Sequence, residues 1–212
     1  MASFTTSEPP VPRNHPGTLT TATTTPTPSF GGNGSFTLSC STRIAASPDT
    51  CLGVLLKTGD YPSWNPLIPK VTMDAPPAHP ETDEAKLPPA HLRGADYVAK
   101  GTLMTFEVHV ELNPDKITNR TPIECTMLEP FPGERKGWRL AWKPTSFPEW
   151  FMRSERIQEV VDDGNGGTEY TCWETFYGPF SPVIRMVVGA KLCKGFEGWA
   201  EGMKKFAEGL EK

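Results

Sequence analysis

The sequence has no long apolar run and no excess of positive charge. None of its segments approaches the roughly 18 consecutive apolar residues of a membrane-spanning helix. Its 21 lysines and arginines are outnumbered by 25 aspartates and glutamates, giving a formal net charge of −4. Nucleic-acid binding requires a basic face, so this partner is excluded. The opening residues, MASF, lack the charged and apolar regions of a signal peptide, and we expect a cytoplasmic location.

Metal and phosphate motifs are also missing. The five cysteines are scattered without the spacing of metal ligands, and their odd number leaves at least one unpaired. The glycine-rich run 164–167 joins two expected strands and does not open a helix, as a phosphate-binding loop would. We therefore expect reduced thiols, no metal site and no cofactor.

The sequence divides into a polar N-terminal segment and one domain. Residues 1–34 are dominated by Pro, Thr, Ser and Gly, a composition that buries too little apolar surface to offset its ordering entropy. They are predicted to be a disordered tail. Residues 35–212 are long enough for a single domain with a sizeable core.

Within the domain, a change of hydrophobic period separates strands from helices. Residues 36–44 alternate as a strand does, and Ser47 followed by Pro48 starts a short helix. Proline-flanked aromatics at 61–66 predict a second short helical turn, and the proline-rich run 75–96 predicts an exposed loop or lid. Further strands are expected within these ranges: 70–73, 102–111, 123–129, 138–143, 151–161 and 168–177.

The C-terminal part predicts one long amphipathic helix. Apolar residues from Ile184 to Leu210 recur every three or four positions, with lysines and glutamates between them. Five glycines interrupt this pattern, each costing about 1 kcal/mol relative to alanine. We expect some of them to let the helix approach the sheet closely.

This order of elements resembles the START-like superfamily, also called SRPBCC, which includes polyketide cyclases and birch-pollen-allergen-like carriers. Residues 46–49 (ASPD) and 61–68 (YPSWNPLI) are similar to its first helix and its P-x-W-N-P-F element, and residues 167–178 (GTEYTCWETFYG) resemble its last strand. The resemblance covers about residues 35–210. It implies an α+β helix-grip fold: a curved antiparallel sheet of about seven strands around a long C-terminal helix, with two short helices after the first strand. No catalytic residue comes with it.

Candidate chemistry lies on the last two strands. Arg153 and Glu155 share one face of strand 151–161. Asn165-Gly166 as a two-residue turn would place Glu155 opposite Phe176 and Ile157 opposite Glu174, so that Glu174 lies diagonally from Glu155 on the same face. In an apolar cavity, burial would raise the pKa of one glutamate while Arg153 keeps the other ionised, as acid/base catalysis requires. The alternative is exposed cross-strand ion pairs on the outer face.

Aromatic side chains are the predicted cavity wall. Trp138 and Trp142 alternate on one face of their strand, and four more aromatics join them as candidate ligand contacts: Trp64, Phe106, Phe176 and Trp199. Ordinary core packing explains the same side chains equally well. The two functions expected are a cofactor-independent cyclase or dehydratase acting on a lipophilic intermediate, and a non-catalytic carrier of a lipid or secondary metabolite.

Overall fold

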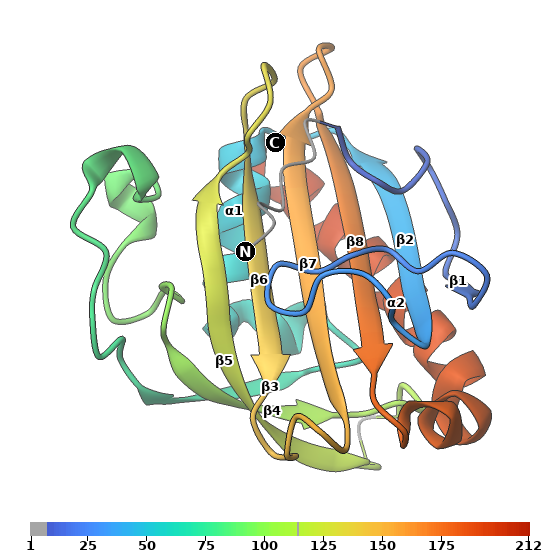
Figure 1. The fold of residues 1–212 in the computed structure, drawn as a ribbon. Coiled ribbons are helices and arrows are strands. Elements are labelled where there is room, and N and C mark those ends of the chain that lie inside the picture. Colours follow the sequence, from blue (N-terminus) through green and yellow to red (C-terminus); the bar gives the residue numbers. More distant parts are fainter. Residues whose placement is uncertain (1–7, 114) are drawn as a thin grey trace.

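A single antiparallel sheet organises the molecule, a computed structural model that describes residues 8–113 and 115–212 (Figure 1). The strands are β1 (Thr18–Thr20), β2 (Phe36–Ile44), β3 (Lys70–Ala75), β4 (Leu103–Val108), β5 (Asn119–Pro130), β6 (Gly137–Pro144), β7 (Arg153–Asp162) and β8 (Thr168–Tyr177). Their order across the sheet is β1-β2-β8-β7-β6-β5-β4-β3. Seven of these strands, β2–β8, match the predicted domain.

The helices form from the local signals expected. The first, α1 (Pro48–Leu56), begins where the Ser47 hydroxyl accepts a hydrogen bond from the backbone N–H of Thr50 at 3.1 Å. A 3-10 helix spans Thr58–Ser63, and two further short ones, Glu84–Lys86 and Ala90–Leu92, lie in the predicted loop. The long helix α2 covers Ser181–Leu210.

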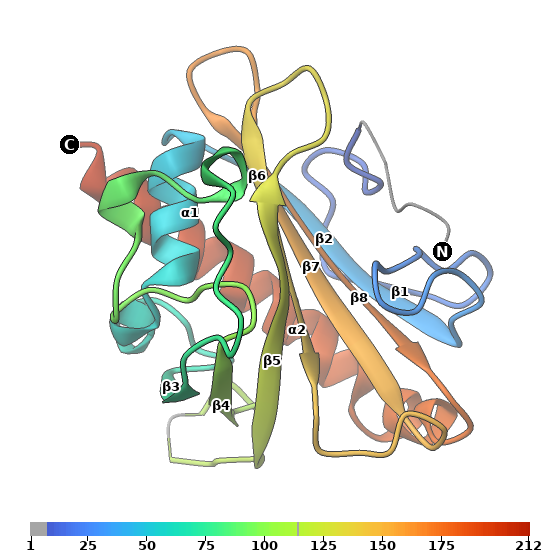
Figure 2. The ribbon, with the colours of Figure 1, turned by 60° about the vertical axis from the view of Figure 1, so that its left-hand side comes forward.

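Both α-helices lie on the concave face of the sheet, where the main core forms. Figure 2 shows α1 and α2 on one side of the strands and the N-terminal segment on the other. Glycines allow the close approach predicted for α2, because a Cβ at Gly202 would collide with the carbonyl oxygen of Trp64. A Cβ at Gly195 would likewise lie 2.8 Å from Leu67.

The N-terminal segment differs from the prediction. Residues 8–34 run across the convex face over β6, β7 and β8 (Figure 1), and β1 pairs with β2. The segment's Val11 joins Ala141, Ile157 and Trp173 in a second buried cluster. The prediction of a disordered tail is therefore wrong for residues 8–34. The segment is ordered because its backbone hydrogen-bonds to β2 and because its few apolar side chains are buried against the sheet. Residues 1–7 lie outside the described part.

Candidate ligand-binding site

The concave face and the first half of α2 border a partly open cavity of about 300 Å³. Its wall on α2 comes from Ile184, Val188 and Leu192, which are four residues apart and so share one side of the helix. Strands β4–β8 supply the opposite wall, which is mostly apolar. The volume lies at the lower end of the range for small-molecule sites, roughly 300–1,000 Å³. A small lipophilic molecule fits these dimensions.

One ion pair is the polar centre of this cavity. Arg156 on β7 and Glu174 on β8 are directly paired in the sheet, and Nε and Nη2 of Arg156 lie 3.1 and 3.0 Å from Oε2 of Glu174. The Ser154 hydroxyl donates to the other oxygen, Oε1, at 2.8 Å. The guanidinium also stacks over the ring of Phe196, 4.2 Å from its centroid. Burial lowers the pKa of Arg156, but the electrostatic interactions with Glu174, Cys172 and Tyr170 and the hydrogen bond to Glu174 together outweigh this and raise it overall, so the arginine stays charged.

Hydrogen-bond donors outnumber acceptors around this ion pair. Among the described residues, the buried donors without an acceptor include Nη1 of Arg156, Nε2 of Gln158 two residues along the strand, and Nε1 of Trp199 beside the guanidinium. Gln158 uses its oxygen to accept from the hydroxyl of Tyr170 at 2.6 Å. Of these residues only Arg156 lines the cavity, and because an unpaired buried donor is costly, it favours a ligand that brings an oxygen acceptor.

The predicted pairing of β7 with β8 is wrong by one residue. Ser154, and not Glu155, is opposite Phe176, and Arg156, and not Ile157, is opposite Glu174. The connection is not a two-residue turn, because Asp162 pairs with Thr168 and five residues loop out between them. A shift of one residue moves side chains to the other face. Glu155 and Glu174 therefore lie on opposite faces of the sheet.

The other two predicted catalytic residues lie on the convex face. Glu155 is fully buried there, accepting hydrogen bonds from the backbone N–H of Ser29 at 2.8 Å, the Ser29 hydroxyl at 2.7 Å and the Thr126 hydroxyl at 2.6 Å. The guanidinium of Arg153 lies over the rings of Phe30 and Tyr177, 5.3 and 5.5 Å from their centroids. These contacts attach the N-terminal segment to the sheet. Neither residue reaches the cavity.

The predicted aromatic contacts separate into three groups. Phe106, Trp142 and Phe176 line the cavity, as expected. Trp199 is buried beside it, with its ring 5.5 Å from the Arg156 guanidinium, while Trp138 is partly buried and lies outside the lining. Trp64 lies in a different hollow.

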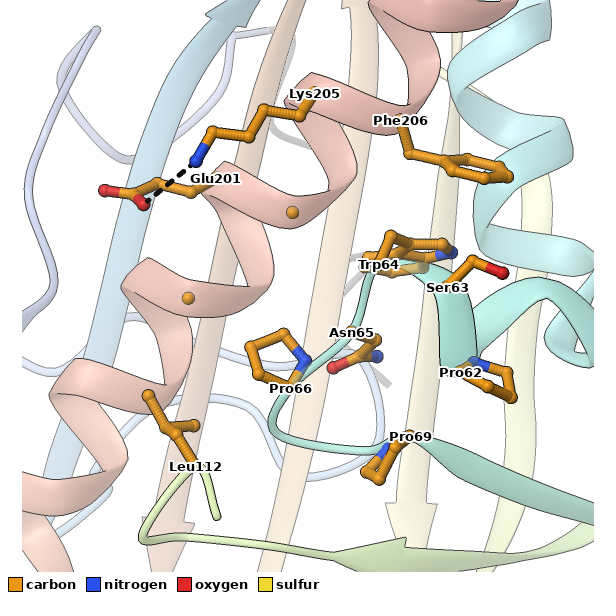
Figure 3. A pocket seen from close by; sticks show the side chains of 12 residues that line it. Pro62, Ser63, Trp64, Asn65, Pro66, Pro69, Leu112, Glu201, Lys205 and Phe206 are labelled. Atoms are coloured by element: carbon orange, nitrogen blue, oxygen red, sulfur yellow. Dashed lines mark ion pairs between the residues drawn. The ribbon is translucent and has the colours of Figure 1, made fainter. Parts of the chain in front are cut away.

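This second hollow, about 690 Å³, is an open groove between α2 and the chain following α1 (Figure 3). Three prolines, Pro62, Pro66 and Pro69, form one wall, and Glu201 and Lys205 form an ion pair at 4.0 Å on the helix. A guest here would stay in contact with solvent. The cavity with the Arg156–Glu174 pair is the stronger candidate.

Sequence reasoning did not single out Arg156, Ser154 or Gln158. Their positions follow from the alternation of side chains along β7, since these even-numbered residues face opposite to Arg153 and Glu155. Had the register been known, the basic residue paired with Glu174 would have been evident. In the described ranges, no three His, Cys, Asp or Glu side chains are grouped closely enough to hold a metal ion. None of the described helices has the length and hydropathy of a membrane span.

The architecture is a helix-grip fold of the kind found in START superfamily proteins, as the resemblance predicted. No protein-family model matches the chain. A START superfamily protein from Mycobacterium smegmatis has a similar fold, with a TM-score of 0.54 and 14% identity over 82% of this chain and 98% of that protein. A di-domain ARO/CYC protein from the steffimycin biosynthetic pathway matches with a TM-score of 0.52 and 13% identity, covering 82% of this chain and 52% of that one.

One curated relative is similar in sequence. It is the oxopyrrolidines biosynthesis cluster protein O of Penicillium oxalicum, which is 26% identical in an alignment of 187 residues; the match covers 80% of this chain and 85% of the relative.

Proposed function

We propose that this protein acts in secondary-metabolite biosynthesis as a cofactor-independent enzyme of the polyketide cyclase or dehydratase type. The observation that carries the proposal is the buried Arg156–Glu174 pair, which borders an apolar cavity and has a donor to spare. The similarity to a biosynthesis cluster protein and to an ARO/CYC fold supports the same class of chemistry.

In this mechanism, Arg156 stabilises negative charge and Glu174 transfers the proton. Arg156 donates to a carbonyl oxygen of the ligand and stabilises the enolate that forms when Glu174 takes a proton from the neighbouring carbon. That carbon then attacks a second carbonyl, or a hydroxyl group leaves from the adjacent carbon. Protonated Glu174 returns its proton to the new alkoxide or to the departing hydroxyl, which leaves as water.

The apolar wall would contribute by holding the chain folded. Phe106, Trp142 and Phe176 offer flat surfaces on three different strands, against which an unsaturated chain can pack in one conformation. Holding the two reacting carbons close together lowers the entropy cost of reaching the transition state. The same wall keeps bulk water from the enolate.

A carrier is the second candidate, and one observation favours it. Both oxygens of Glu174 are already engaged, Oε1 by Ser154 and Oε2 by Arg156. In a carrier, a carboxylate held in this way would position the arginine that binds the ligand and take no part in proton transfer. In this case the molecule would leave the cavity unchanged.

Native mass spectrometry of protein purified from its producing organism separates the two functions. We expect the wild type to carry product or nothing, and Glu174→Gln to retain an unconverted precursor, heavier by one water if the reaction is a dehydration. Val108→Trp fills the cavity and is expected to remove the bound molecule. The matched control on the same strand is Leu103→Trp, whose side chain is 43% exposed and outside the cavity lining.

Two outcomes would count against the proposal. The same molecule recovered from the wild type and from Glu174→Gln, with identical fragmentation, supports the carrier and contradicts catalysis. Equal binding by the wild type and Val108→Trp would show that the ligand lies elsewhere and would contradict both functions.

A further inference from the structure

Large apolar side chains are exposed where the cavity ends between α2 and the β6–β7 connection. Trp150 is 74% exposed and Phe147 43% exposed on that connection, and Met186 and Val187 on α2 are 80% and 64% exposed. Such side chains are individually common on surfaces, but a contiguous group marks an interaction site. With Val183, 39% exposed, we call these five residues the mouth patch.

Ring contacts join the two segments of the mouth patch. Trp150 lies against Phe151, with centroids 5.7 Å apart, and Phe151 stacks on Phe180 at 4.8 Å, immediately before α2. Phe147 belongs both to the patch and to the cavity lining. The patch is therefore continuous with the wall of the cavity.

The apolar surface of the first half of α2 extends beyond the side that faces the cavity. Ile184 and Val188 line the cavity, while Val183, Met186 and Val187 are exposed. A helix in a globular protein normally buries its apolar surface. The outward side of this segment has no covering element in the described part of the chain, so a partner outside the chain accounts for it.

The charges on α2 indicate what kind of partner fits. Residues 181–196 contain Arg185, Lys191 and Lys194 and no acidic residue, although the whole chain has a net charge of −4. Residues 197–211 contain four glutamates and two lysines, so the net charge changes sign. Lys191 is paired with Glu111 at 2.8 Å, and Arg185 and Lys194 therefore carry the positive charge that accompanies the exposed apolar side chains.

We propose that the mouth patch docks on the surface of an anionic lipid bilayer, so that a lipophilic ligand passes between membrane and cavity without crossing water. Apolar side chains with tryptophan enter the headgroup region, and adjacent lysines and arginines are attracted to anionic lipids. A second copy of the chain fits less well, since a symmetric contact would bring the same cations together.

Flotation with lipid vesicles tests the proposal on the full-length protein. We expect binding to vesicles of phosphatidylcholine with phosphatidylserine, and much weaker binding to phosphatidylcholine alone. Trp150 is far more exposed than the buried Trp64, Trp142, Trp173 and Trp199, so its fluorescence should shift to the blue on binding. Trp150→Phe should abolish most of that shift while retaining binding.

Matched variants assign the binding to the patch. Replacing both Trp150 and Met186 by Ser should weaken vesicle binding by about tenfold or more, since each side chain gives up a buried apolar surface. Leu210→Ser is the control, because Leu210 is 61% exposed at the far end of α2. Arg185→Ala and Lys194→Ala should each cost about fivefold on anionic vesicles, whereas Lys205→Ala in the second half should not.

Three results would overturn the proposal. One is no binding to either vesicle, and another is an equal loss with Leu210→Ser. The third is a dimer in sedimentation velocity that the Trp150 and Met186 changes dissociate, which would assign the patch to a second copy. These results are independent of the test of the proposed function. Native mass spectrometry of the Glu174→Gln variant measures the bound molecule, and its outcome does not depend on whether the protein binds vesicles.

Discussion

Each face of the sheet buries an arginine–glutamate pair, and the two pairs differ in how much of their surface is exposed. On the convex face, Arg139 and Glu159 are both fully buried, with Nη2 of the arginine 2.7 Å from Oε1 of the glutamate. On the concave face, the side chains of Arg156 and Glu174 keep 8% and 12% of their exposure. That remaining surface faces the cavity. The same residue types are thus closed off on one face and accessible to a small molecule on the other.

The two ion pairs also differ in whether a donor or an acceptor is left without a hydrogen bond. Among the described residues, the convex pair leaves an acceptor unpaired, Oε2 of Glu159, while the concave pair leaves a donor, Nη1 of Arg156. Burial raises the pKa of Glu159 to about 7 despite the opposing charge of Arg139, so a proton can satisfy the convex pair. A permanently charged arginine has no such option. It requires an acceptor from elsewhere, which a ligand can provide.

The largest expected effect is the removal of the convex arginine. Arg139→Met leaves Glu159 uncompensated in a dry environment and should lower the free energy of unfolding by ~3–5 kcal/mol. Arg156→Met should cost less, because Glu174 can be hydrated through the cavity, yet it should abolish ligand retention. Urea unfolding followed by circular dichroism measures the first quantity, and native mass spectrometry the second.

Lys143→Met is the control for that comparison. Lys143 belongs to the same strand as Arg139, but its pair with Glu149, at 3.5 Å, lies at the surface. Exposed pairs contribute only ~0–1 kcal/mol. Equal destabilisation by the three changes would show that the two faces do not differ in the way described.

The pH dependence of stability should report on the convex pair. Because the pKa of Glu159 rises from 4.5 to about 7 on folding, its stabilising contribution is complete below 4.5 and is lost as the pH rises through about 7. Glu159→Gln imitates the protonated acid and lacks this loss. As the pH rises between these values, the difference in stability between the variant and the wild type should therefore shift in favour of the variant by up to about 3 kcal/mol.

Unfolding measured across this pH window checks the prediction. Nearby charges also act on Glu159, notably Arg139, Glu169 and Arg135, and they are common to both proteins. Glu174→Gln on the concave face serves as the comparison. A constant difference between wild type and Glu159→Gln at every pH would mean that the pKa of Glu159 does not change on folding.

The fold could be predicted because its signals are local and repeated. The alternation in residues 168–177 gave β8 with its bounds, and the Ser47-Pro48 start of α1 and the period of α2 were confirmed. Three aromatics of the cavity wall, Phe106, Trp142 and Phe176, followed from the same patterns.

The register of β7 and β8 could not be predicted because it depends on loop hydrogen bonds. Asp163 accepts from the backbone N–H groups of Asn165 and Gly167, and Asp162 accepts from that of Gly164. These bonds stabilise a five-residue loop in place of the Asn-Gly turn. Because the register differs by one residue from the prediction, Arg156 and not Glu155 faces the cavity.

The ordering of the N-terminal segment could not be predicted either, because it depends on a partner surface. Thr25 and Pro26 make hydrogen bonds to Thr37, Thr175 and Trp173, all on the sheet. Composition describes the segment alone and not the face that it covers.

The smallest expected effect comes from one hydroxyl on each face. The Ser29 hydroxyl donates to Glu155 at 2.7 Å and the Ser154 hydroxyl to Glu174 at 2.8 Å, so Ser29→Ala and Ser154→Ala remove the same group from opposite sides. Ser29→Ala should cost ~1–2 kcal/mol, since a buried carboxylate loses a charge-assisted bond, and leave the bound molecule unchanged. Ser154→Ala should cost less, because the cavity can hydrate Oε1, but it should alter the ratio of precursor to product. A change in the bound molecule with Ser29→Ala would show that the convex face does more than stabilise the fold. An effect of Ser154→Ala on stability alone would show that the Arg156–Glu174 pair takes no part in the reaction.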